Sequence, residues 1–298
     1  MKNSLLTLFA SVAIVAVCQA ESYTLKLTRP EKVGNKAEVS AKGTDQISQK
    51  TAVGGEVVKD EKTYGSGSLD AVREVLAVSA KGKPTKLKFT VKSLQYTADK
   101  DVAPKEILAG GKEIIAVVKG KENSFTIDGD AADETMTKAL KLVISLGDES
   151  NATDADAMFN TKQPHAVGDE WDAGIDELIK SMGADTPIQF DPKACTGKIK
   201  LERVEKVNGI ECCILTGSIT LLVPPAVRGV PEGTDFTGST VKISLNCPVP
   251  TDPAAPEIGG KFVMDMALKA DINTPNGGKG KFNMANKMVR EESAKPVK

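Results

Sequence analysis

The stretch KIKLERVEKV-NG-IECCILTGSITLL, residues 198–222, decides the fold class. Asn208-Gly209 fits a two-residue β-turn, because Asn and Gly tolerate the positive φ angles that such a turn requires. Apolar residues recur at every second position before and after this pair, which is typical of strands that bury one face. The stretch therefore predicts a long antiparallel hairpin.

The same period-two alternation continues on both sides of this hairpin. It appears in these segments: Leu25–Leu27, Val39–Ala41, Lys86–Val91, Phe125–Ile127, Val241–Cys247, Phe262–Ile272 and, after Asn276-Gly277-Gly278, Phe282–Met288. Leu94 and Tyr96 follow Val91 one residue out of phase, which predicts a β-bulge. The predicted fold class is mainly β (α+β), with curved antiparallel sheets or a partial barrel whose strands are solvated on one side.

Two helices are expected to pack on these sheets. Asp130 precedes an apolar stripe over 131–146, and Asp172 precedes a second stripe over 173–182, so each Asp is a candidate N-cap. A short helical turn is expected around 152–159. The helical segment 130–183 separates an N-terminal β-rich part (21–129) from a C-terminal antiparallel part (184–298), and the two parts are able to form one continuous domain.

The first twenty residues predict export. Lys2 precedes the apolar run Leu5–Val17, and Cys18-Gln19-Ala20 places small residues at a cleavage site, as in a secretory signal peptide. A run this short does not span a bilayer core of roughly 30 Å. We expect a periplasmic or extracellular mature chain that starts at Glu21. Lipidation of Cys18, with tethering to a membrane, is the alternative, although Val17 is an unusual residue before a lipidated cysteine.

Composition excludes some partners. The formal net charge is −1 and aromatic residues make up 4% of the chain, so there is neither a basic excess for nucleic acid nor a supply of aromatic rings for carbohydrate stacking. No cofactor motif is present. The expected partners are an apolar small molecule or an envelope protein.

Four cysteines remain after the predicted cleavage: Cys195, Cys212, Cys213 and Cys247. An exported chain with an even number of cysteines permits disulfides. Cys213 and Cys247 share the apolar phase of strands expected to be neighbours, so a Cys213–Cys247 bond is the first prediction. Buried free thiols are the alternative.

Candidate catalytic and metal-binding residues are sparse. His165 is the sole histidine, and no nucleophile motif accompanies it. Asp128, Asp130 and Asp133 cluster before the first helix, but they depart from the EF-hand pattern, and helix capping accounts for them. No catalytic residue and no metal site is predicted. Gly65-Ser66-Gly67-Ser68 is too short for a phosphate loop and is expected to be a flexible turn.

Methionines gather on the last two predicted strands. Met264, Met266 and Met284, together with Phe282, are candidates for the wall of an apolar ligand cavity. An ordinary core is the alternative for these residues. Copper binding through thioether sulfurs, with Met288 as a fourth, is a weaker one.

The layout resembles a loose group of exported bacterial proteins of planctomycete and verrucomicrobial type. The resembling features are the strand Tyr23–Leu27, the segment Val167-Gly168-Asp169-Glu170-Trp171 and the closing hairpin Gly259–Met288. The resemblance implies an exported β-rich protein, and it carries no activity and no functional residues.

Three functions follow as hypotheses. The first is a non-enzymatic envelope protein that binds an apolar ligand or a protein partner in a sheet concavity. The second is a scaffold that uses exposed strands or Pro-rich loops. The third is a hydrolase that uses His165, which requires a nucleophile within hydrogen-bond reach of the imidazole.

Overall fold

The protein is described by a computed structural model that covers residues 21–120, 122–146, 154–182, 188–228, 230, 233–273 and 278–297. The predicted signal peptide with Cys18 and the predicted turn residues Asn276 and Gly277 lie outside these ranges. The strands are β1 (Ser22–Tyr23), β2 (Lys36–Val53), β3 (Glu56–Val78), β4 (Pro84–Thr97), β5 (Lys105–Ala109), β6 (Glu113–Lys119), β7 (Glu122–Ile127), β8 (Asp130–Ala131), β9 (His165–Ala166), β10 (Glu170–Asp172), β11 (Thr196–Val207), β12 (Ile210–Leu222), β13 (Thr240–Pro250), β14 (Gly259–Asn273) and β15 (Lys279–Pro296). The helices are α1 (Glu134–Val143), α2 (Ala155–Met158) and α3 (Ile175–Ser181), and a 3₁₀ turn spans Pro192–Ala194.

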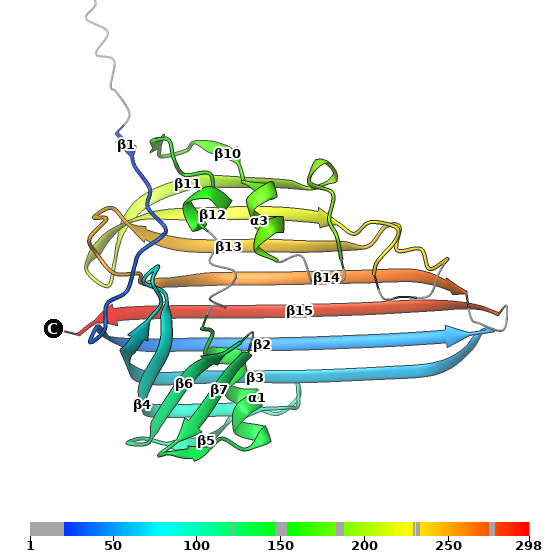
Figure 1. Ribbon diagram of the computed structural model, residues 1–298, viewed down its shortest axis with the longest axis horizontal. Helices are drawn as coiled ribbons and strands as arrows, with labels where there is room; N and C mark the ends of the chain where they lie inside the picture. The colour runs from blue at the N-terminus through cyan, green and yellow to red at the C-terminus, as the bar shows by residue number, and fades with distance from the viewer. Residues whose placement is uncertain are drawn as a thin grey trace, which may run out of the picture.

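Thirteen of the described strands form one antiparallel sheet (Figure 1). The order is β10-β11-β12-β13-β14-β15-β2-β3-β4-β6-β7-β8, with β5 paired to β4. The last strand, β15, pairs with β2 along almost its whole length, so the N-terminal and C-terminal β parts share one sheet. The prediction of a mainly β, antiparallel fold with a few packed helices is confirmed, and the sheet is open, with β10 and β8 at its ends.

Local sequence accounts for the strands. The β11–β12 hairpin turns at Asn208 and Gly209, which adopt φ angles of 52° and 82°. The predicted bulge is also present: Val91 pairs with Ala71 and Ser93 with Asp70, which leaves Lys92 as the extra residue.

The helices lie on one face of the sheet, which we call the helix face. In Figure 1, α1 lies over β3 and α3 lies over β12 and β13, with the strands β14, β15 and β2 between them. On β2 and β3, the helix face carries Gly43, Gly65 and Gly67, and a Cβ atom at any of these positions would meet Leu142 of α1. The expected flexible turn at Gly65–Ser68 is therefore wrong. These residues are inside β3, where missing side chains let α1 approach the sheet.

Two helix starts differ from the prediction. Asp133, not Asp130, caps α1 by accepting a hydrogen bond from the Met136 backbone at 2.7 Å. Asp130 instead belongs to β8, because Asp128-Gly129 turns the chain back after β7. Likewise, α3 starts after Gly174, while Asp172 ends β10 and pairs with Lys198 at 2.8 Å. Tertiary pairing has replaced local capping at both positions.

The expected N-terminal strand is shorter than predicted. Only Ser22–Tyr23 pairs, with His165–Ala166, and the chain then crosses the helix face without joining the sheet. The Leu27 backbone donates to the Asp156 carboxylate at 2.6 Å, which replaces a strand partner. Leu25 is buried against β11, β12 and β13.

Two large apolar clusters lie on the helix face. One is built around α1 and the strands from β2 to β7, with Leu69, Leu94 and Leu140 fully buried. The other joins α3 to β11–β15 and is centred on Ile199 and Leu221. In the described part of the chain, no helix is long and apolar enough to cross a membrane.

Candidate functional site

An apolar cavity of about 360 Å³ lies between the two helical clusters, over the centre of the sheet. Its floor is the helix face of β12, β13 and β14, because cross-strand pairing sets Ile219 beside Ile243 and Leu245 beside Phe262. Side chains from all three helices form its walls: Leu142, Val143, Met158 and Leu178, with Phe159 just after α2. The cavity therefore exists only where both halves of the chain meet.

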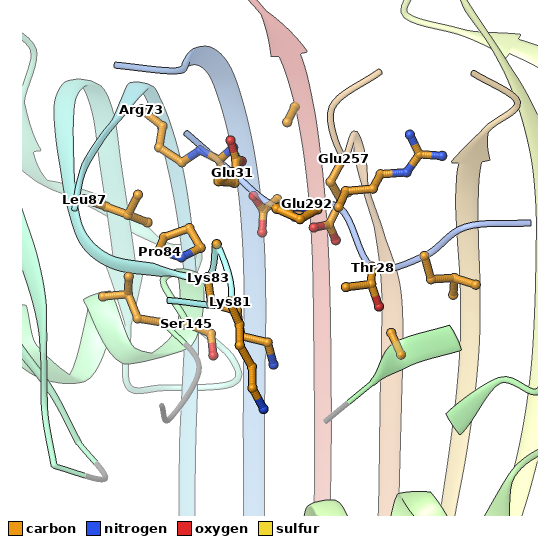
Figure 2. Close-up of a pocket in the computed structure, with 18 of the residues that line it drawn as sticks. Thr28, Glu31, Arg73, Lys81, Lys83, Pro84, Leu87, Ser145, Glu257 and Glu292 are labelled. Carbon is orange, nitrogen blue, oxygen red and sulfur yellow. The ribbon is translucent and has the colours of Figure 1, made fainter. Parts of the chain in front are cut away.

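A second cavity, of about 440 Å³, adjoins the first at the end of β15 (Figure 2). The two share Ser145, Met158, Glu257, Gly259 and Glu292 as lining residues, so they are parts of one hollow. The second cavity is bounded by the crossing segment Leu27–Glu31 and carries several charged groups.

Three of these charged groups are fixed by the protein itself. Arg73 pairs with Glu31 at 2.6 Å, and both side chains are mostly buried. Glu31 also accepts a hydrogen bond from Asn35 at 2.7 Å. The Arg29 guanidinium donates to the backbone oxygens of Pro250, Asp252 and Ala255. The crossing segment is thereby held against β3 and against the loop before β14.

Two carboxylates have no such partner. Within the described residues, no hydrogen bond or ion pair reaches the side chain of Glu257 or Glu292, and both residues are exposed where they line the cavity. Figure 2 shows the two carboxylates next to each other, while Lys81 and Lys83 extend away from them. Desolvation by the surrounding protein atoms raises the pKa of both carboxyls.

Neighbouring charges modify that effect. Repulsion by Glu292 and Glu31 raises the pKa of Glu257 further, and attraction by Arg73 and Arg29 partly offsets it. The pKa of Glu292 is lowered in part by Arg73 and Arg290, and raised by Glu31. The hollow therefore combines an apolar floor and apolar helix walls with charged lining residues, of which Glu257 and Glu292 line both cavities.

The predicted methionine wall lies on the correct face but beside the cavity. Cross-strand pairing places Met264 and Met266 on the helix face, with Met284 opposite Leu268 on the neighbouring strand. These side chains are half-buried, and neither cavity described here is lined by them. Phe282 packs edge-to-face on Phe236 at 6.4 Å, so a side chain of the chain itself fills that position.

The predicted disulfide is not formed. The strands pair as expected, but Cys213 lies opposite Val249 and Cys247 opposite Leu215, two residues out of register with each other. Such diagonal neighbours are about 7–8 Å apart, too far for a bridge without backbone movement. Both thiols are free, and burial raises the pKa of each to about 11. Cys195 and Cys212 are also free and buried.

His165 does not sit with a nucleophile. Its ring stacks on Trp171 at 3.6 Å, and the Trp171 indole donates to the Phe159 backbone at 2.8 Å. The buried Nε2 atom of His165 has no hydrogen-bond partner in the described structure. The arrangement gives the hydrolase hypothesis no support, because that hypothesis required such a partner.

The acidic residues before the first helix make hydrogen bonds and ion pairs with neighbouring groups of the protein. Asp128 pairs with Lys112 at 2.8 Å and accepts from the Glu113 backbone, which lowers the pKa of its carboxyl. Asp133 caps α1, as described above. Among the residues that the structure describes, no three His, Cys, Asp or Glu side chains lie close enough together to hold a metal ion.

Sequence reasoning missed Glu257 and Glu292 as well as the cavity lining at Leu245, Phe262 and Leu178. The apolar members were visible as part of the alternating pattern and the helix stripe. For the two glutamates the sequence held one signal: Glu292 is a charged residue in the inward-facing phase of the closing strand, two residues before Ala294.

Comparisons with known proteins do not assign this chain. No family model matches it, and no curated protein matches it. A lipovitellin structure titled for its lipid–protein interactions is similar with a TM-score of 0.29 and 8% identity, over 90% of this chain and 26% of that chain. DynF from the dynemicin biosynthesis pathway of Micromonospora chersina gives a TM-score of 0.16 and 10% identity, over 95% and 88% of the two chains. This chain spans about a quarter of the lipovitellin chain, and neither likeness is close enough to carry an argument.

Proposed function

We propose that this protein is an exported, non-enzymatic binding protein that holds an apolar ligand between α1 and the α2–α3 pair. The apolar cavity of about 360 Å³ carries this proposal. Its volume falls within the range of roughly 300–1,000 Å³ typical of small-molecule sites. Each CH₂ group of a ligand buried there contributes about 0.8 kcal/mol.

Packing explains why the space remains open. Leu142 of α1 is held at the glycine notch of β2 and β3, and Leu178 of α3 packs with the cluster over β11–β15. The two helices therefore dock on different strands. Leu245 and Phe262 lie at the edge of the α3 cluster that faces α1, where they line the cavity between the two helices.

The scaffold alternative has less support. Apart from the neighbours Val57 and Val58 on β3, the large apolar side chains that are exposed in the described structure fall on separate segments, among them Val33, Val102 and Leu222. Single exposed apolar residues are normal on protein surfaces, whereas an interaction site is expected to be contiguous.

Competition with a neutral dye tests the proposal. Nile red is titrated into the protein spanning residues 21–298, and dodecanol is then added as a competitor. Leu178→Trp fills the cavity and is expected to weaken dodecanol binding at least tenfold. Val263→Trp is the matched control, because Val263 is next to Phe262 on the same strand but on the opposite face. Equal affinities in the two variants would refute the proposed site.

A further inference from the structure

We infer that the apolar cavity selects a ligand with a carboxylate head, which Arg290 binds while an apolar chain extends between α1 and α3. The inference rests on the proposed function and adds the class of ligand, a long-chain carboxylate. Three features carry it: the position of Arg290, the lack of a counter-ion for its guanidinium, and the charge balance of the hollow.

Arg290 brings a guanidinium into the apolar part of the hollow. On the helix face, β15 places this residue between Phe262 of β14 and Gly43 of β2. Phe262 lines the apolar cavity together with Arg290, and Gly43 leaves room for the end of α1. The guanidinium therefore lies where the apolar floor meets the last turn of this helix.

The end of α1 fixes the orientation of this side chain. The Nη2 atom of Arg290 donates to the Lys141 backbone oxygen at 2.7 Å. Carbonyl oxygens in the last turn of a helix lack intrahelical partners and carry partial negative charge, so they attract a guanidinium. The Nε atom of Arg290 is buried and has no hydrogen-bond partner in the described structure. The lining of an apolar cavity thus contains an oriented donor that has no acceptor.

No carboxylate forms an ion pair with Arg290 in the described part of the chain. Asp45 lies diagonally across from it on β2, opposite Met288, and the Oδ1 atom of Asp45 is itself buried without a partner. Glu292, two residues along β15, is exposed, so water solvates its carboxylate. Desolvation lowers the pKa of Arg290, and attraction by Asp45 and Glu292 offsets this only in part. A ligand carboxylate would supply the counter-ion and accept a charge-assisted hydrogen bond.

The charge balance of the hollow also favours an anion. Basic residues outnumber acidic residues in the lining of the two cavities. Lys81 and Lys83 extend away from the two glutamates (Figure 2), and within the described residues they form no ion pair. Because Glu257 and Glu292 are exposed, water screens their repulsion of a ligand carboxylate. The lining therefore attracts an anionic head more strongly than it repels one.

The rest of the apolar cavity suits a hydrocarbon chain. Besides Arg290, the same cavity is lined by Ile243 and Leu245 of the floor and by Leu178 of α3. These side chains offer no hydrogen bond, so they stabilise a chain only by removing it from water. The polar head of a ligand is thus directed to Arg290 and its chain toward α3.

Two twelve-carbon probes that differ only in their heads test the inference. Laurate and dodecanol, below their micellar concentrations, displace Nile red from the protein spanning residues 21–298 at pH 8. Laurate is expected to bind at least tenfold more tightly than dodecanol. In Arg290→Met this preference is expected to vanish. Leu178→Trp is expected to weaken the binding of both probes at least tenfold, because either chain lies against α3.

Controls keep the outcomes distinct. Arg203→Met is the matched control, because Arg203 of β11 pairs with Glu205 and lines neither cavity, and this variant is expected to keep the preference for laurate. Thermal unfolding shows whether each variant is folded. Arg290→Gln, which retains an amide donor for the Lys141 oxygen, replaces Arg290→Met if the methionine variant does not fold.

The result also separates this inference from the proposed function. If dodecanol binds but laurate has no advantage, or if the advantage survives the loss of Arg290, the inference fails and the proposed function stands. If neither probe binds, both fail.

Discussion

Replacing Gly43 by Ala tests whether α1 is seated on β2 as described. A methyl group at Gly43 would overlap the backbone oxygen of Leu142 and lie 2.7 Å from its carbonyl carbon, well inside ordinary contact. The obstacle is helix backbone, which cannot rotate away. The helix, with Leu140 fully buried beneath it, must then move by a fraction of an ångström or more.

The magnitude follows from two opposing effects. Overpacking of this kind costs about 1–3 kcal/mol. Alanine loses less conformational entropy than glycine in a strand, which returns about 0.5–1 kcal/mol. The net expectation is a destabilisation of about 1–2 kcal/mol.

Gly65→Ala is the matched control, because Gly65 lies on the same face of the next strand. A methyl group there meets the end of the Leu142 side chain at 3.3 Å, which can rotate away, and the Tyr96 ring at 3.7 Å, an ordinary contact. We expect this variant to be neutral or slightly stabilised. Urea unfolding measures the stability of both variants, provided that the free energy of unfolding depends on urea concentration with the same slope as in the wild type. For a slope near 3 kcal/mol/M, the Gly43→Ala midpoint should be about 0.5 M lower than the wild-type midpoint. Equal midpoints would show that α1 does not contact β2 at Gly43.

Three further predictions concern other parts of the molecule. Because folding raises the pKa of Glu257 and Glu292, their protonated forms stabilise the fold, and this contribution disappears as pH rises through the raised pKa values. The urea midpoint of the wild-type protein should therefore fall with pH in that window, and the midpoint of Glu257→Gln/Glu292→Gln should fall less. Parallel pH profiles of the two proteins would contradict the raised pKa values. Cys213, fully buried with a pKa of about 11, should resist iodoacetamide at pH 8 in the native protein and react after unfolding, and an intact mass two daltons low would instead reveal a disulfide with Cys247 or another cysteine. Asn208→Ala should lower Tm by about 2–4 °C, because alanine at a φ of 52° is strained by about 1 kcal/mol. Asn208→Gly should lower Tm by less. An unchanged Tm in the alanine variant would argue against a left-handed residue in this turn.

Much of the sheet was predictable because strand signals are local. The alternation around Asn208-Gly209 gave a hairpin with its turn in place, and the phase slip between Val91 and Leu94 gave the bulge at Lys92. Each depends on residues that are close in sequence, so neighbouring residues alone contain the information.

Errors arose where distant residues decide the outcome. Asp130 has the character of a helix cap, yet the turn at Asp128 recruits it into β8. Gly65 and Gly67 have the composition of a loop, yet they accommodate the helix α1, which is distant in the sequence and starts only at Glu134. Cys213 and Cys247 share a face, but only the register of β12 against β13 shows that they are offset by two residues.

The sequence by itself determined the strands, which of their faces is apolar, and the presence of two main helices, because periodicity and turn chemistry act over a few residues. Only the tertiary structure decided where the helices dock, and hence which part of that apolar face stays uncovered. Met264 and Leu245 have the same phase and were indistinguishable in the sequence, but only Leu245 lines the cavity. Glu257 and Glu292 meet for the same reason: the pairing of β14 with β15 and the crossing of the N-terminal segment bring them to one hollow.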